Sequence, residues 1–399
     1  MDAHAPVWDF AMKKTLFITM LTAALLGGKV YANTGFEGGT MMPDGFQVVG
    51  DGNLRIFENP DSQYEKIHDA YGLKCFERTA EYAVVTVEGG IVDHVYGAYV
   101  EHGSARHNMV KVTGGTIKGV YGSRSDVGHE NVDYNTVIVD GGMISVSIIG
   151  GFAADSDVYM SADYNKVYIT NLADVCAPDV YGGYSVREAY ENEVHLVGEG
   201  AAISIENERL EGHSMTLGNV CSGYAPEVQF NSVHIYGSGI QAVSLTHMQI
   251  LNFHLVDGVA TIKAPIVTLS GTVVPLNMAN FSLGLIADDV TDLKLLAGRT
   301  VTLAETQLAI AGFGESSYKV VNVSKGEQAD AAKALITLGA EGKELLLTVL
   351  SSSTELLEPG ASRQAGSATM GASAVASPST RWKLRICMWV RDTAWMPLP

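Results

Sequence analysis

Short runs of alternating apolar and polar residues recur through the middle of the chain, and each run begins with asparagine. The pattern Asn-x-Val-x-Val/Ile/Leu occurs at Asn108, Asn135, Asn165, Asn192 and Asn231. A period of two residues predicts a strand with one buried face. Residues 81–240 show no apolar stripe with the 3.6-residue period of a helix. We therefore expect an all-β protein.

A second motif, Val/Ile-Tyr-Gly followed by a small residue, alternates with the first without exception. Its copies and close variants occupy residues 95–98, 120–123, 148–151, 180–183 and 220–223. Their second residues lie 25, 28, 32 and 40 positions apart. A unit of about 25 residues made of short strands and turns is close to one coil of a parallel β-helix. The predicted fold is therefore a right-handed parallel β-helix (solenoid) with N- and C-terminal caps.

Within a unit, the sequence predicts a constant frame and variable connections. The Gly pairs at 114–115 and 141–142 indicate turns where φ can be positive. Residues 117–120 read as a second short strand. Length changes concentrate in segments such as 98–108 and 123–135 and just after the Val-x-Val strand, so we expect loops there.

Stacked units would align equivalent side chains into ladders. Asparagine at each strand start would bond its own turn and the asparagines above and below; the simpler alternative is that Asn is merely a common turn residue. Two further ladders are expected. The inward one comprises Val110, Val137, Val167, Val194 and Val233, and the aromatic one comprises Tyr96, Tyr121 and Tyr181, interrupted by Ile149 and Cys221.

The N-terminal part divides into three segments. Residues 12–32 read as a secretory signal peptide, with Lys13 and Lys14 before an apolar stretch too short to span a bilayer and Val30-Tyr31-Ala32 at a cleavage site. Residues 1–11 carry acids ahead of this basic start and are interpreted as a spurious upstream extension. Residues 33–80 match neither motif and are predicted to be the N-terminal cap, because a solenoid needs its first edge covered.

The remaining segments are predicted as repeats, further coils and a tail. Residues 81–250 hold the β-helix repeats, and 251–358 hold further coils and a C-terminal cap. Residues 359–399 change composition abruptly and contain three of the four Trp, so we interpret them as a frameshifted or disordered tail. One set of codons that encodes residues 379–398 gives a different peptide when it is translated in the frame two bases further on. That peptide alternates apolar with polar or small residues, like a membrane strand.

The amino-acid composition restricts which kinds of partner the chain can bind. The net charge of −18 repels phosphate backbones and argues against nucleic-acid binding. The four cysteines, Cys75, Cys176, Cys221 and Cys387, form no close-spaced framework. Two alternatives remain for Cys176 and Cys221, which lie in neighbouring repeats: a disulfide bridge between them, or two unbridged thiols.

No residue pattern carries recognisable chemistry, so we predict no catalytic, cofactor or metal site. Acid/base candidates are the carboxylates Asp93, Asp126, Asp133, Asp140, Asp155 and Asp157, with Asp133 and Asp140 bracketing a strand start. The loop histidines His94, His102, His107 and His129 match no ligand spacing, and the Asp-rich segment around 151–165 matches no calcium loop. Phosphate-binding, nucleophile-elbow and zinc-protease motifs are absent from the sequence.

The combination of a signal peptide, Asn-x-Val-x-Val-x-Gly-Gly and Val-Tyr-Gly-Gly resembles the passenger region of bacterial autotransporters. The segment "LKLLAGRTVTLAETQ" is similar to the part that precedes their outer-membrane barrel. The resemblance covers residues 12 to 358. It implies export, display by the protein's own C-terminal β-barrel translocator, and a non-enzymatic role as adhesin or structural stalk contacting surface glycans or proteins. The chain stops before a barrel, which the frameshift interpretation of the tail would explain.

Three alternatives accompany this expectation. Pectin-lyase-like proteins share the architecture and would make the chain an exported polysaccharide-degrading enzyme. A gene that truly ends here would make it a free periplasmic or secreted solenoid. A trimeric coiled-coil adhesin is disfavoured because the sequence has no heptads.

Overall fold

The computed structural model describes an all-β protein in which long parallel rows of strands dominate. It describes residues 33–37, 46–48, 53–56, 67–77, 79–127, 131–154, 160–173, 176–255, 265–287, 299–313, 318–325 and 328–351. Within these ranges the one helical element is a single 3-10 turn, η2 (Ala340–Gly342). No helix in this part of the chain is both long and apolar enough to cross a bilayer.

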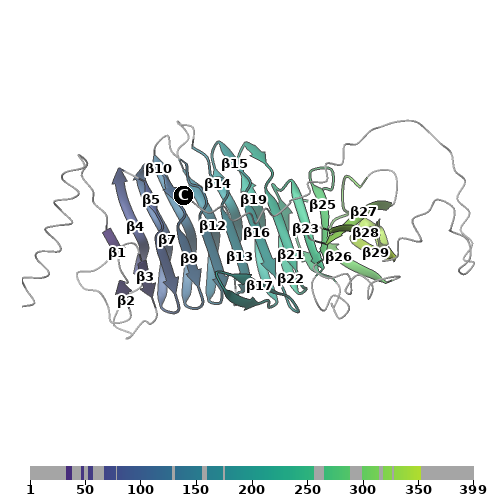
Figure 1. Cartoon of the computed structure of the whole chain (residues 1–399), viewed down its shortest axis with the longest axis horizontal. Coiled ribbons are helices and arrows are strands. Elements are labelled where there is room, and N and C mark those ends of the chain that lie inside the picture. Colours follow the sequence, from purple (N-terminus) through teal and green to yellow (C-terminus); the bar gives the residue numbers. More distant parts are fainter. Residues whose placement is uncertain are drawn as a thin grey trace, which may run out of the picture.

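Most strands belong to two rows in which every neighbouring pair runs parallel. Row 1 consists of β3 (Asn53–Ile56), β6 (Val84–Val87), β9 (Met109–Val112), β11 (Thr136–Asp140), β13 (Lys166–Asn171), β16 (Glu193–Val197), β21 (Ser232–Tyr236), β23 (Ile250–Leu255), β25 (Ser282–Ala287) and β27 (Tyr318–Lys325). Row 2 consists of β4 (Ile67–Glu77), β7 (Ile91–His102), β10 (Thr116–Val127), β12 (Met143–Ala153), β14 (Asp179–Ser185), β19 (Met215–Tyr224), β22 (Ile240–Thr246), β24 (Val267–Leu269) and β26 (Thr300–Thr306). Figure 1 shows these strands side by side along an elongated molecule.

Shorter strands complete the fold. Two small parallel pairs lie beside the rows, and one antiparallel hairpin follows β16. The pairs are β5 (Ala80–Glu81) with β8 (Ala105–Arg106) and β15 (Glu188–Tyr190) with β20 (Glu227–Gln229); the hairpin is β17 (Ala202–Ile205) with β18 (Glu208–Glu211).

The predicted valine ladder is confirmed. Val110 pairs with Val137, Val137 with Val167, and the series continues through Val194 to Val233 in parallel register. All five side chains are fully buried. They join one apolar cluster that also takes residues from row 2, so the core lies between the two rows. Alternation in the sequence thus becomes a continuous apolar column.

The predicted asparagine ladder is also confirmed, with one difference in its bonding. Asn135 donates from its backbone N–H and from Nδ2 to Oδ1 of Asn165, both at 3.0 Å. Its Nδ2 also donates to the Ala105 carbonyl oxygen in the preceding unit, rather than to its own turn. The same pattern repeats at each rung, and Gln249 takes the place of the next asparagine above Asn231. Because each rung is fully buried, these bonds satisfy backbone groups that would otherwise lack partners.

The ladder explains why glycine recurs in the second motif. A Cβ on Gly150 would overlap the carbonyl oxygen of Gly182 and crowd the side chain of Asn165. A Cβ would overlap an equivalent carbonyl oxygen and crowd an equivalent asparagine at three other glycines, Gly97, Gly122 and Gly182. The two motifs therefore alternate because one packs directly against the other. The Gly pair at 141–142 has positive φ at both residues, as the turn prediction required.

Row 2 strands are longer than the sequence predicted. The expected strand at 117–120 is part of β10, which continues through the Tyr-Gly motif to Val127, and β7 likewise continues to His102. Much of the two segments predicted as loops is therefore strand, because the parallel neighbour supplies hydrogen bonds beyond the motif. The aromatic row forms as expected, with Tyr96 and Tyr121 stacked at 4.8 Å between ring centroids.

Both strand rows extend one unit further toward the N-terminus than the motifs indicated. Tyr71 pairs with Tyr96, and β3 pairs in parallel with β6, inside the range 33–80 assigned to the cap. Ala70-Tyr71-Gly72 is a degenerate copy of the second motif, with Ala in place of Val or Ile. Strands β1 (Asn33–Glu37) and β2 (Phe46–Val48) then pair antiparallel with β4 and β3.

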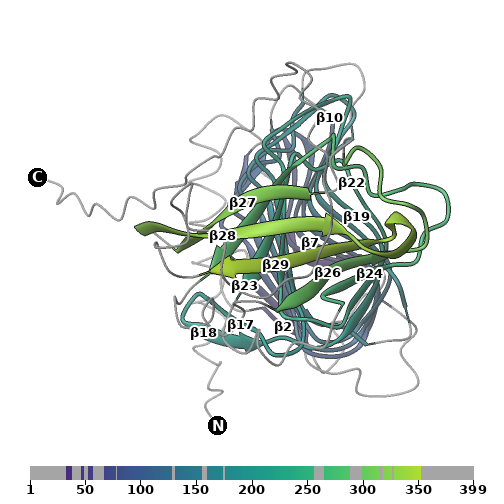
Figure 2. The ribbon, with the colours of Figure 1, turned by 90° about the vertical axis from the view of Figure 1, so that its right-hand side faces the viewer.

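Antiparallel strands also end the rows at the other side. Strand β28 (Gln328–Leu338) pairs with β27 at the end of row 1, and β29 (Glu344–Ser351) pairs with β26 at the end of row 2. Because β28 and β29 pair with each other, they join the two rows. Figure 2 shows these strands crossing the end of the molecule. Ile336, Leu345 and Leu347 contribute to the core from this lid.

Several predictions concern residues outside the described ranges. These are the extension at 1–11, the signal peptide at 12–32 and the tail at 359–399, together with the side chains of Asp155, Asp157, His129 and Cys387.

Candidate functional site

The outer face of row 1 carries a line of aligned side chains between the buried valines. Tyr168 of β13, His195 of β16 and His234 of β21 pair in register. The ring centroids of Tyr168 and His195 lie 4.4 Å apart, as do those of His195 and His234, and both pairs are stacked. The register therefore turns three separate strands into one aromatic column on the outside of the row.

The hairpin β17–β18 lies against this face. It occupies the longest spacing between motif copies, where the sequence predicted a loop. Ile203 of the hairpin and Tyr236 of β21 both pack against the small buried cluster of Val197 and Ala201. At its tip, Glu208 pairs with Lys111 of β9. In Figure 1 the hairpin lies over the lower ends of the row 1 strands.

Glu193, His195 and His234 bring three ligand-type groups together. One ligand atom from each lies within 4.8 Å of the others, the one such group of His, Cys, Asp and Glu found among the described residues. His195 Nε2 lies 2.9 Å from Glu193 Oε2, and Lys166 Nζ lies 3.1 Å from the same oxygen. The His195 side chain is 10% exposed and the Glu193 side chain 28%, so the group is more open on the carboxylate side.

The second ring nitrogens of both histidines also have partners. His195 Nδ1 lies 3.1 Å from the Tyr236 hydroxyl, and His234 Nδ1 lies 2.9 Å from His254 Nε2. Ser232, which pairs with Glu193 in register, has its hydroxyl 3.0 Å from His234 Nε2. Both Nε2 atoms therefore face the Glu193–Ser232 side of the cluster.

Burial controls the protonation of this cluster. It lowers the pKa of His195, and, with the neighbouring histidines, it holds the pKa of His234 well below its usual range and lowers that of His254 to about 3. Burial opposes ionisation of Glu193 as well, but the hydrogen bond from His195 and the Lys166 charge outweigh it and lower the Glu193 pKa to about 2. Neutral imidazoles beside an ionised carboxylate are the form in which these groups bind metals.

A second column of rings lies at the corner just before the asparagine ladder. Each of its residues has positive φ and comes directly before an asparagine of the ladder or the equivalent position of another unit. The residues are Tyr82, His107, Tyr134 and Tyr164. Neighbouring rings are stacked with centroids 5.3, 5.0 and 4.7 Å apart. The three tyrosines are 36–68% exposed. We call this set the corner column; it presents aligned ring edges to solvent.

The predicted histidines do not converge. His94 Nδ1 lies 3.0 Å from Asp69 Oδ1, His107 belongs to the corner column, and His102 ends β7. The structure instead groups His195, His234 and His254, which the sequence analysis did not single out. A signal was present: "NEVHL" and "NSVHI" place histidine at the same position of successive asparagine motifs.

Three of the predicted carboxylates each have a local partner. Asp93 pairs with Lys118 at 2.8 Å, Asp126 with Arg124 at 2.6 Å, and Asp140 accepts from Thr170 Oγ1 at 2.6 Å. These partners place them at three separate points of the frame.

Asp133 lies near another carboxylate, that of Asp163, rather than near Asp140. Burial first, and then the Asp163 charge, raise the pKa of Asp133 to about 7. Asp133 and Asp163 are only 9% and 8% exposed, which leaves little surface for a substrate.

The alternative of a Cys176–Cys221 bridge is excluded, because neither residue forms a disulfide. Cys221 is buried with Sγ 3.0 Å from Thr246 Oγ1. Burial raises the pKa of its thiol to about 11.

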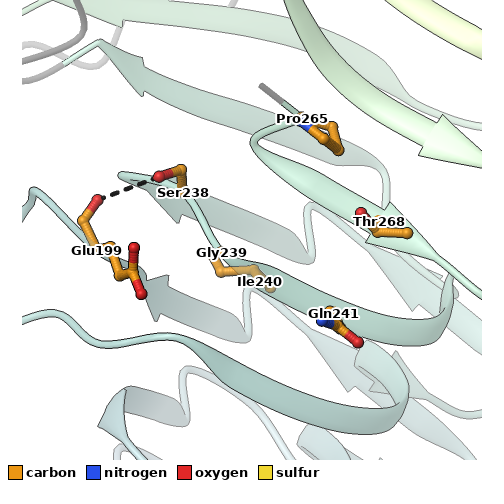
Figure 3. Close-up of a pocket in the computed structure, with 7 residues that line it drawn as sticks. All are labelled: Glu199, Ser238, Gly239, Ile240, Gln241, Pro265 and Thr268. Carbon is orange, nitrogen blue, oxygen red and sulfur yellow. Dashed lines mark hydrogen bonds between the residues drawn. The ribbon is translucent and has the colours of Figure 1, made fainter. Parts of the chain in front are cut away.

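A shallow cavity of about 210 Å³ lies near the hairpin base (Figure 3). Glu199 and Ser238 form one side, joined by backbone hydrogen bonds of 2.8 and 3.0 Å, and Pro265 and Thr268 form another. Glu199 is the one titratable residue among the seven that line it. A single carboxylate offers neither an acid/base pair nor a ligand set.

Comparison with known proteins identifies no relative: no family model, no curated protein and no solved structure matches the chain.

Proposed function

We propose that this chain is the exported passenger of an autotransporter-like protein, folded as a right-handed parallel β-helix and serving as an adhesin or structural stalk. The observation that carries this proposal is the continuous in-register pairing of the repeats in two parallel rows. The antiparallel strands at both ends of the rows support the assignment of N- and C-terminal caps. The predicted signal peptide and the motif resemblance support export.

A stalk needs stiffness and a long contact face rather than an active site. Stacked units contact only their neighbours, so the molecule grows in length without changing its cross-section. The corner column offers exposed rings along this length, a composition typical of contact surfaces. The partners proposed are an outer-membrane translocator and glycans or proteins at a host or bacterial surface.

Folding would also help export, because each unit that docks on the last opposes backward movement through a translocator. Val167→Pro tests this, since proline removes a ladder hydrogen bond in the middle of row 1. Val273→Pro, in an exposed bend outside both rows, is the matched control. Protease added to intact cells that carry the full gene reports surface display.

We expect the unmodified chain and the Val273 variant to be cleaved at the cell surface, and the Val167 variant to be retained inside. A chain that remains in the cytoplasm would contradict export. A chain found folded in the periplasm alone would favour the free periplasmic solenoid instead.

The alternative of a polysaccharide-degrading enzyme has one observation in its favour, the Asp133 carboxyl with its raised pKa beside Asp163. Glycosidases use two carboxyl groups with separated pKa values. The low exposure of both residues opposes it. Release of reducing ends from acidic glycans, lost in Asp133→Asn, would favour the enzyme over the stalk.

A further inference from the structure

The strongest unassigned chemistry lies on the outer face of row 1. We propose that Glu193, His195 and His234 form a binding site for a zinc ion. Two imidazoles and one carboxylate are a common protein ligand set for zinc, with water in the remaining position. Their ligand atoms lie within 4.8 Å of one another.

The spacing of these atoms suits the ion. Tetrahedral zinc with bonds of about 2.0–2.1 Å holds its ligand atoms about 3.3 Å apart. His195 Nε2 lies 2.9 Å from Glu193 Oε2, and no two of the three ligand atoms are more than 4.8 Å apart. These values bracket the required separation, so small side-chain shifts would bring the three ligand atoms to it.

The hydrogen bonds on the far side of each ring orient the ligands. Without an ion, His195 donates its Nε2 proton to Glu193. When zinc binds, the neutral ring carries its proton on Nδ1, where the Tyr236 hydroxyl accepts it, and the Nε2 lone pair is free for the ion. With the proton of His234 on Nδ1, His254 Nε2 accepts it, and the second Nε2 lone pair faces the same side. Such partners fix the tautomer of a metal-bound histidine and raise its affinity for the ion.

The fold positions these residues at little conformational cost. Both histidines are two positions after the first strand residue, and the strands pair in register, so the rings are aligned before an ion arrives. His195 stacks between Tyr168 and His234, which restricts its rotation. The Glu193 side remains open to solvent and gives the ion a path of entry.

The positive charge of Lys166 weakens zinc binding, and its removal therefore provides an internal test. Its ammonium group lies 3.1 Å from Glu193 Oε2, where it neutralises the carboxylate in the absence of metal. The Lys166 side chain is 42% exposed, so it can move into solvent when zinc binds. Removal of this charge in Lys166→Met should tighten zinc binding, whereas loss of a ligand should weaken it.

The experiment is calorimetric titration of the purified, chelator-treated full chain with zinc chloride at neutral pH. We expect one zinc per chain, weakened at least about tenfold in His195→Gln and in His234→Gln and tightened in Lys166→Met. His213→Gln, at an exposed histidine outside the cluster, should bind as the unmodified chain does. Cobalt substitution provides a second readout, because four-coordinate cobalt absorbs visible light far more strongly than six-coordinate cobalt.

Thermal unfolding without metal identifies any histidine variant that fails to fold. The test with Lys166→Met remains valid in that case, because it does not need the histidine variants. Zinc should raise the unfolding temperature of the unmodified chain and of the His213 variant by the amount that the zinc concentration and their measured affinity require. The proposal is overturned if the unmodified chain takes up no zinc. It is equally overturned if the His195, His234 and His213 variants bind zinc with one affinity.

Discussion

Replacement of a central rung of the asparagine ladder is the most direct test of how the rows are held together. Asn165 is fully buried. Its Nδ2 donates to the Val132 carbonyl oxygen at 2.8 Å and to Asn192 Oδ1 at 3.1 Å. Its Oδ1 accepts from the backbone N–H and the Nδ2 of Asn135, both at 3.0 Å. Asn165→Ala removes all four bonds.

The expected cost follows from the groups left behind. Asn135 Nδ2 keeps its bond to the Ala105 carbonyl oxygen, and Asn192 Oδ1 keeps the backbone N–H of residue 165. The Asn135 N–H and the Val132 carbonyl lose the partner that Asn165 gives them. A buried polar group left unsatisfied costs about 1–3 kcal/mol. The substitution should therefore destabilise the fold by about 2–6 kcal/mol.

Urea unfolding of the purified chain, followed by far-UV circular dichroism, measures this loss. Because repeat arrays can unfold in parts, hydrogen exchange of the Asn135 amide provides a local measurement. Asn280→Ala, at an exposed asparagine outside both rows, should change stability by less than about 0.5 kcal/mol. If Asn165→Ala costs no more than this control and the Asn135 amide exchanges at its former rate, the ladder does not stabilise the rows.

Three further predictions concern other features. Gly150→Ala should destabilise the fold by about 1–3 kcal/mol, since its Cβ overlaps the Gly182 carbonyl oxygen; an unchanged urea midpoint would refute this. Asp133, with a folded-state pKa of about 7, binds its proton more tightly when folded, so stability should fall as pH rises from about 4 to 7, by up to about 4 kcal/mol. Urea midpoints across this range should lose that slope in Asp133→Asn. Lys111→Met should cost under about 1 kcal/mol, because its partner Glu208 is largely exposed; a larger loss would mean that the ion pair holds the hairpin.

The repeating parts of the fold were predictable because local pattern and long-range packing impose the same requirement. Alternating valines must face a core, and five equivalent asparagines at strand starts can satisfy one another only if the strands align. The structure places Val137 and Asn135 as that reasoning required. The all-β class and the parallel, in-register pairing of repeats follow from these two motifs alone.

Features that depend on non-repeating contacts were not predicted. The length of β10 is set by its neighbours in row 2, because residues without apolar alternation still gain ladder hydrogen bonds there. The hairpin β17–β18 is stabilised against the outer face of row 1, which cannot be read from its own residues. The histidine cluster depends on the register of β16 with β21, so it becomes evident only after the repeats are aligned.

The lid formed by β28 and β29 has a consequence for how copies of this protein meet. Parallel strands at the end of a stack present unpaired N–H and C=O groups that would template the same strands of another molecule, as in amyloid fibres. Here the last strands of both rows hydrogen-bond to the lid instead. End-to-end polymerisation is blocked at this terminus, so a crowded population of such molecules can remain as separate particles.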